Sequence, residues 1–77
     1  MENKLAEQGF MVKATIQMSS GPSEQFYAVG KDTAPEAVDA VFQQLGQQGS
    51  VEVGKRLSEQ EIAGLALKPN EVRQYAP

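Results

Sequence analysis

The sequence predicts an α+β fold in which one main helix packs on one face of a small sheet of three or four strands. Two patterns predict it: residues 12–18 alternate apolar and polar side chains, and apolar side chains repeat with helical spacing along residues 34–45. A chain of 77 residues buries only about 60% of its unfolded surface and holds a single core. We therefore expect a flexible lead-in at residues 1–10 and one domain at residues 11–77.

The first strand is predicted at residues 12–18, where apolar residues alternate with Lys13, Thr15 and Gln17. This alternation is typical of a strand with one face buried and the other in water. The segment SSGPSE, residues 19–24, follows the strand and is rich in residues that form turns. The chain is therefore expected to turn back as a β-hairpin.

The second strand of the hairpin is predicted at residues 25–30 and is apolar on both faces. Because successive side chains of a strand point to opposite faces of a sheet, Phe26 and Tyr27 do not share a face. One of the two rings must therefore face away from the main helix, and the sequence leaves open which one.

The main helix is predicted at residues 33–45. Thr33 and Glu36 have the spacing of a capping box, and Pro35 is tolerated in a first turn, where its missing N–H is not needed. Gly46 stands where a residue in the left-handed conformation would end the helix.

The stretch AVGKDTAPEAVDAVF, residues 28–42, places Gly30 and Lys31 just before this helix and raises the question of a phosphate-binding loop. Such a loop reads GxxxxGK followed by serine or threonine, so that backbone amides, the lysine and the hydroxyl converge on the phosphates. Here Gln25 replaces the first glycine and Asp32 replaces the hydroxyl. We interpret the stretch as the joint between a strand and a helix.

The C-terminal third of the chain contains a predicted strand at residues 51–56 and a short helix at residues 59–66. Ser58 and Glu61 have the spacing of a second capping box at the start of that helix. The tail, residues 71–75, is either a last strand or one more helical turn, because periodicity over so few residues does not choose.

The predicted core combines apolar side chains of the first and third strands with those of both helices. Truncating Phe42 to alanine is expected to cost about 3–5 kcal/mol of stability. The expected core residues are Val12, Ala14, Ile16, Val38, Val41, Phe42, Leu45, Val51, Val53, Leu57, Ile62 and Leu65.

The composition excludes several classes of chemistry. Without cysteine or histidine the chain has no thiolate nucleophile, no disulfide, no histidine-based triad and none of the usual zinc or iron ligand sets. No set of residues pairs a nucleophile with its base or forms a cofactor loop. We therefore expect a protein that is not an enzyme and has no catalytic residues, no cofactor and no metal.

Charge and hydropathy bear on partners and location. Ten acidic against seven basic residues give a net charge of −3, which argues against a dedicated nucleic-acid-binding protein. The opening MENKLAEQGF has no apolar core of signal-peptide length, and no run approaches the roughly 20 apolar residues of a membrane span. We expect a soluble cytoplasmic protein with no membrane contact.

The predicted function is a small protein-interaction or regulatory module that binds through the sheet face away from the main helix. An exposed aromatic ring with an arginine is a common composition at the centre of an interface. The alternative is a nucleic-acid-binding protein, in which the ring stacks on a base of a single strand and cations lie near phosphates. The candidate surface comprises Lys13, Thr15, Gln17, Phe26, Tyr27, Lys55 and Arg56.

A small sheet also has unpaired edges, which natural proteins guard with charges, proline or another chain. The first strand has one charge, Lys13, and residues 25–29 of the second strand have none. We expect a weak homodimer through one of these strands, the second if the first is central, although the same edge could accept a strand from a partner protein.

The segment EIAGLALKPNEVRQY, residues 61–75, resembles the turn region of helix-turn-helix DNA-binding proteins. The resemblance implies a further form of the nucleic-acid alternative, in which residues 58–75 form a degenerate helix-turn-helix. The segment departs from that family in two respects. The interval between Ala63 and Val72 is one residue short, and the recognition helix would have barely two turns.

The order of hairpin, helix, strand, short helix and last strand is similar to that of ubiquitin-like β-grasp proteins, over residues 12–76. Those modifiers end in a diglycine and this chain ends in Tyr75, Ala76 and Pro77, so the resemblance implies a binding module without conjugation. The stretch QFYAVGKDTAPEAVDAVFQQLG is more loosely similar to the archaeal ribosomal protein LX family. This chain lacks the basic residues that would hold ribosomal RNA phosphates, and we do not assign it there.

Overall fold

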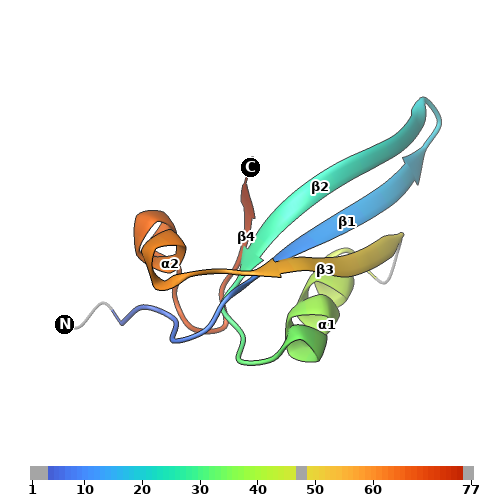
Figure 1. The fold of residues 1–77 in the computed structure, drawn as a ribbon. Helices are drawn as coiled ribbons and strands as arrows, with labels where there is room; N and C mark the ends of the chain where they lie inside the picture. The colour runs from blue at the N-terminus through green and yellow to red at the C-terminus, as the bar shows by residue number, and fades with distance from the viewer. Residues whose placement is uncertain (1–3, 47–48, 76–77) are drawn as a thin grey trace.

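A computed structural model gives the structure of the chain and describes residues 4–46 and 49–75. Within these residues the chain forms a four-stranded antiparallel sheet and two helices, which confirms the predicted α+β class (Figure 1). In chain order the elements are β1 (Phe10–Met18), β2 (Gly21–Val29), α1 (Ala34–Gln44), β3 (Ser50–Arg56), α2 (Glu59–Leu65) and β4 (Val72–Tyr75).

The strands lie in the order β3-β1-β2-β4, and each is antiparallel to its neighbours. The tail therefore forms a last strand, which pairs with β2 and not with β1. In a β-grasp sheet the last strand lies beside the first, so the similarity to that family ends at the order of elements. The helix-turn-helix alternative is wrong, because the residues of its recognition helix form β4.

The strand order also changes which edges of the sheet are accessible. β1 is central, and β4 covers β2 from Phe26 to Val29. The prediction that a dimer forms through residues 25–29 of the second strand is therefore wrong, since nearly all of that segment already has a neighbour on each side. The strands at the two edges of the described sheet are β3 and β4.

The hairpin is longer, and its turn tighter, than the sequence indicates. β1 and β2 pair over their full length, and only Ser19 and Ser20 form the turn. Pro22 lies inside β2, at the end of the strand that extends beyond β4 (Figure 1). Its missing N–H is tolerated there because one side of the strand has no neighbour in the described chain.

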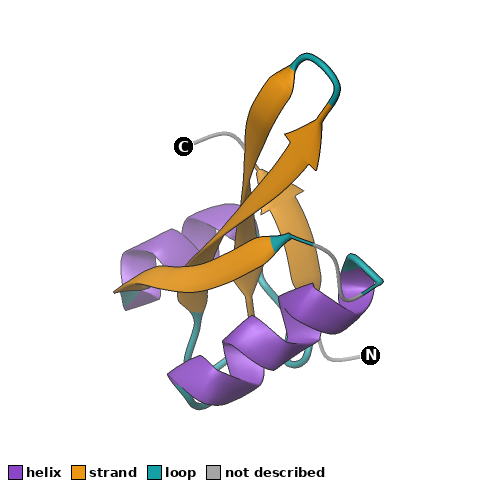
Figure 2. Cartoon of the chain, turned by 90° about the vertical axis from the view of Figure 1, so that its right-hand side faces the viewer, coloured by secondary structure: helices purple, strands orange, loops and turns teal. Residues whose placement is uncertain are grey.

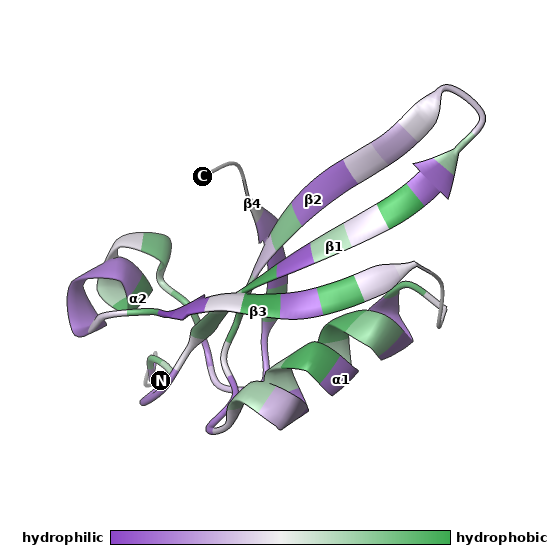
Figure 3. Cartoon of the chain, turned by 45° about the vertical axis from the view of Figure 1, so that its right-hand side comes forward, coloured by the Kyte–Doolittle hydropathy of each residue, from purple (hydrophilic) through white to green (hydrophobic). Residues whose placement is uncertain are grey.

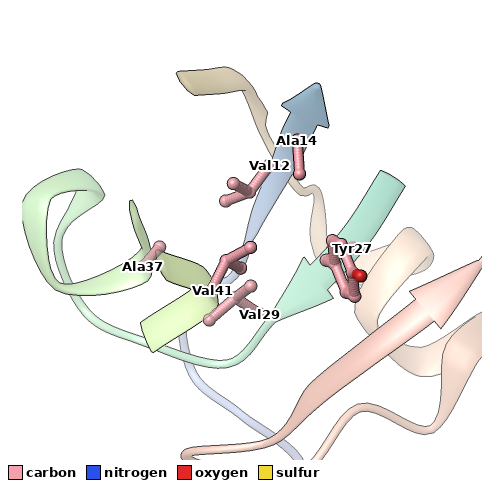
Figure 4. Close-up of a cluster of buried hydrophobic side chains, with 6 residues drawn as sticks. All are labelled: Val12, Ala14, Tyr27, Val29, Ala37 and Val41. Atoms are coloured by element: carbon pink, nitrogen blue, oxygen red, sulfur yellow. The ribbon is translucent and has the colours of Figure 1, made fainter. Parts of the chain in front are cut away.

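α1 covers one face of the sheet. Its two buried side chains, Ala37 and Val41, contact a row of side chains from the central strands (Figure 4). Removing such a row from water stabilises the fold by roughly 25 cal/mol for each Å² of apolar surface. This cluster, the α1 core, comprises Val12, Ala14, Tyr27, Val29, Ala37 and Val41.

α2 and the segment before β1 cover part of the opposite face. Leu67 and Ala28 have no exposed surface, and Ile62 of α2 packs with them. Ala6 is only 7% exposed and donates its N–H to the Leu67 carbonyl at 2.8 Å. The expectation that the lead-in lies outside the core is therefore wrong at Ala6, whose small side chain lies in a segment too short and too polar to show a periodic pattern. This second cluster, the α2 core, comprises Ala6, Ala28, Leu57, Ile62 and Leu67.

The predicted core is confirmed in part. Val12, Ala14, Val41, Leu57 and Ile62 are buried, while Leu45, Val51 and Leu65 are half-buried against one of the two cores. Ile16, Val38, Phe42 and Val53 belong to neither core, so truncating Phe42 is now expected to cost less than the loss given above for a core residue. The apolar stripe of α1 is wider than the surface that the helix buries, because only Ala37 and Val41 of the helix are fully buried.

The predicted helix starts agree with the structure. Thr33 accepts a hydrogen bond from the N–H of Glu36 at 3.4 Å, and Ser58 and Glu61 exchange both hydrogen bonds of a capping box. At its other end α2 stops at Ala66, whose φ of 50° lies in the left-handed region. An alanine in that conformation is strained, because its Cβ crowds the following carbonyl.

The backbone at Gly30 aligns β4 with β2. The N–H of Gly30 donates to the Glu71 carbonyl at 2.8 Å, and the Gly30 carbonyl accepts from the N–H of Asn70 at 2.7 Å. A Cβ at Gly30 would lie 2.3 Å from the Lys68 carbonyl oxygen, so a larger residue does not fit. The joint between β2 and α1 is therefore also the place where the tail docks.

Replacing Leu67 by alanine should lower the free energy of unfolding by about 2–5 kcal/mol, because it leaves a cavity in the α2 core. Leu5→Ala is the matched control, since the same atoms are removed from a residue that is 39% exposed. Urea unfolding followed by circular dichroism measures both variants. Equal losses in the two would contradict the described packing.

Two opposite substitutions should each stabilise the C-terminal end of α2. Gly64→Ala should add about 0.5–1 kcal/mol, because a Cβ there meets no atom within 4 Å and alanine favours a helix. Ala66→Gly should add about as much, because glycine adopts the left-handed conformation without steric cost. Thermal melts measure both, and a lower melting temperature in either variant would speak against this helix end.

Candidate functional site

The sheet face opposite α1 is covered by α2 near one end of the hairpin only. Towards the hairpin turn, this face bears the side chains of β1, β2 and β3 that alternate with the buried row. The resulting alternation of hydrophilic and hydrophobic residues along β1 is visible in Figure 3. We call this surface the open face; it comprises Lys13, Thr15, Gln17, Glu24, Phe26 and Glu52.

Lys13 lies between two carboxylates on this face. Its Nζ is 3.1 Å from Glu24 and 3.8 Å from Glu52. Glu24 raises the pKa of Lys13, first through their hydrogen bond and then through its charge. The predicted surface omits both glutamates: Glu24 is assigned to the predicted turn, and the position of Glu52 beside Lys13 depends on the pairing of β3 with β1. A two-residue turn would have placed Glu24 opposite Thr15, diagonal to Lys13.

Phe26 brings an aromatic ring to the open face. It lies opposite Lys13 in the register of the hairpin and is half-buried. Tyr27 points to the other side, where it is only 6% exposed within the α1 core and donates its hydroxyl to Gln25 Oε1 at 2.7 Å. Of the two rings that the sequence left open, only Phe26 is therefore accessible to a partner on this face.

Lys55 and Arg56 lie at the far end of β3, away from Phe26. Lys55 Nζ is 2.6 Å from the carboxylate of Glu61 and so links β3 to α2. The guanidinium of Arg56 donates to the side chain of Gln8 in the segment before β1. Tyr27 is buried in the α1 core, and the rest of the predicted surface falls into two parts, one at the open face and one at the end of β3 next to α2 and the segment before β1.

Arg73 joins β4 to the end of α2 beside the open face. Its guanidinium is 2.7 Å from the carboxylate of Glu71 and also donates to the carbonyl of Leu65 at the end of α2. The pKa of Glu71 is lowered by the backbone N–H of Lys68 and then by Arg73. The sequence carries no local signal for this link, because it depends on the pairing of β4 with β2.

A pocket of about 210 Å³ lies at the joint between β2 and α1, next to Gly30 and Lys31, the residues compared above with a phosphate-binding loop. Lys31 Nζ at this joint donates to Asn70 Oδ1 at 3.0 Å, and the N–H of Gly30 is taken by the backbone of the tail. The lysine and the amide that a phosphate would need are therefore already engaged. The pocket is also lined by three carboxylates, those of Glu7, Asp32 and Glu36.

In residues 4–46 and 49–75 no group of three or more aspartate, glutamate, histidine or cysteine side chains is arranged to hold a metal ion. No helix in the described part of the chain is long and apolar enough to cross a membrane. Comparisons of the chain with protein-family models, with curated proteins and with solved structures found no match.

The contacts of Glu71 predict an acid-sensitive link between β4 and α2. Because its pKa in the folded chain lies below the ordinary value of 4.5, folding favours the ionised carboxylate. The stability that this contributes is complete above the ordinary pKa and is lost as the pH falls through the lowered value. The free energy of unfolding should therefore decrease below pH 4.5, and less steeply in Glu71→Gln than in the wild type.

Urea unfolding at a series of pH values between about 3 and about 6 measures this dependence. Glu59→Gln is the control, since it removes a carboxylate of α2 and leaves both contacts of Glu71 in place. If Glu71→Gln followed the pH dependence of the wild type, Glu71 would not form the link described here.

Proposed function

We propose that the chain is a non-enzymatic protein-interaction module and that a partner protein binds its open face. The observation that carries this proposal is Phe26, a half-buried aromatic ring that lies next to polar and charged side chains of the open face. A ring in this setting keeps part of its apolar surface in water and gains free energy when a partner covers it.

The surroundings of Phe26 favour a protein as the partner. The ring stands on β2 and faces Lys13 of β1, the two central strands of the sheet, so it is held in place before binding. Interfaces between proteins commonly combine an aromatic anchor with a polar rim. The carboxylates of Glu24 and Glu52 on either side of Lys13 supply such a rim and would orient a partner more than they would add affinity.

The same charges disfavour the alternative, a single-stranded nucleic acid stacked on Phe26. A phosphate that approached Lys13 would have to displace Glu24 and would still lie close to Glu52. Lys55 and Arg56, which the alternative also needs, lie at the other end of β3. Binding of single strands depends on cations along the backbone as well as on stacking, and this face does not offer them.

Affinity capture with the tagged full chain tests the proposal in a native extract. The wild type should retain a partner protein that Phe26→Ala no longer retains. The reason is that truncating an interface anchor weakens binding by about 30-fold or more. Gln60→Ala, an exposed change on α2, is the control and should retain the partner. A thermal melt establishes that Phe26→Ala is folded at the temperature of the experiment.

A salt titration separates the two functions. Calorimetry with the purified partner should show an affinity that changes little with salt, whereas an oligothymidylate should bind weakly or not at all at low salt. A partner retained equally by Phe26→Ala would contradict the proposed site. An oligothymidylate whose binding requires Phe26 and falls steeply with salt would establish the alternative.

A further inference from the structure

β3 forms one edge of the sheet, with α1 running alongside it on one face (Figure 2). The strand has seven residues, and no other strand of the described chain pairs with its outer side. β4, at the opposite edge, has only four residues. A long edge exposes backbone donors and acceptors that readily pair with another chain.

A β-bulge determines which charges of β3 share a face. The pairing of β3 with β1 shifts between Val53 and Lys55, which makes Gly54 an extra residue. In a regular strand Glu52 and Lys55, three residues apart, would point to opposite faces. Because of the bulge, both point to the face opposite α1.

On the α1 side, the same edge is apolar. Val38 and Phe42 lie one helical turn apart, are half-buried and belong to neither core. α1 connects β2 to β3, and these two strands run parallel because both are antiparallel to β1. Such connections are right-handed as a rule, and in a right-handed connection Val38 and Phe42 lie on the flank of α1 towards β3. Val53 of β3 is 39% exposed on this side. We call Val38, Phe42 and Val53 the edge stripe.

We infer that the chain forms a homodimer in which β3 pairs antiparallel with β3 of a second copy. A two-fold axis normal to the sheet places Val53 opposite Gly54 of the second copy, and each Glu52 then lies opposite Lys55 of the other copy. The two edge stripes meet on the α1 side and remove each other from water. The inference goes beyond the proposed function, since this interface shares only Glu52 with the open face.

A second copy fits this edge better than an unrelated strand because the edge is complementary to itself. Antiparallel pairing about a two-fold axis converts one glutamate and one lysine into two ion pairs. The side chain of Glu52 is 72% exposed and lies 3.8 Å from Lys13, so it is accessible to a second cation. Lys55 accommodates the added carboxylate while it keeps Glu61 on the side of α2.

Charge reversal tests the inferred register. The full chain should dimerise with increasing concentration in sedimentation equilibrium. Glu52→Lys and Lys55→Glu should each raise the dissociation constant about tenfold, because both ion pairs become pairs of like charge. An equimolar mixture of the two variants should recover the affinity of the wild type, because every charge in the mixed dimer faces an opposite one.

Glu59→Lys is the matched control, since it makes the same charge change on α2 and should leave the dissociation constant unchanged. Amide exchange of the wild type provides a readout that needs no variant: β3 amides should exchange more slowly at high protein concentration. A wild type that stays monomeric at millimolar concentration would overturn the inference. The inference would also be overturned if the mixture were no more associated than either variant alone. Amide exchange in β3 that did not depend on protein concentration would overturn it as well.

Discussion

Two consecutive residues of β2, Ala28 and Val29, have no exposed surface although they point to opposite faces of the sheet. The chain must therefore cover both faces at the same place. α1 covers one face, and α2 with the segment before β1 covers the other, so the two cores are separated only by the strand. At the next residue, Gly30, the backbone binds Asn70 and Glu71, and the tail docks there as well. Both helices and the last strand thus depend on this one end of the hairpin.

Because burial is concentrated at that end, the rest of the sheet stays accessible in two places. The hairpin extends past β3 and β4 and leaves the open face around Phe26 uncovered, while the outer side of β3 has no strand beside it in the described chain. The two surfaces differ in chemistry: one presents a ring among charged groups, the other a backbone edge flanked by apolar side chains. Glu52 belongs to both, and its contact with Lys13 is the longer of the two that Lys13 makes. A dimer through β3 would therefore change the charge around Lys13 without moving Phe26.

Three of the cations around these surfaces lie close to acids. Lys13 faces Glu24, Lys55 faces Glu61 and Arg73 faces Glu71. Exposed ion pairs of this kind add little to stability, but they determine which partner gains from approaching the surface. A polyanion would have to compete with a carboxylate at each of these three cations, whereas a protein with its own mixture of charges would not. This distribution of charge is the physical reason for proposing a protein partner rather than a nucleic acid.

The sequence by itself determined the local elements and part of the open face. The alternation along β1 assigns Lys13, Thr15 and Gln17 to one side, and the capping residues locate both helix starts, because each pattern follows from the geometry of a few neighbouring residues. It did not choose between Phe26 and Tyr27, since both faces of β2 are apolar and the exposed ring depends on which face α1 covers. Only the tertiary structure decided the position of β4, the burial of the lead-in and the free edge at β3. These depend on backbone pairing and contacts between residues far apart in the chain, which leave no periodic trace in the sequence.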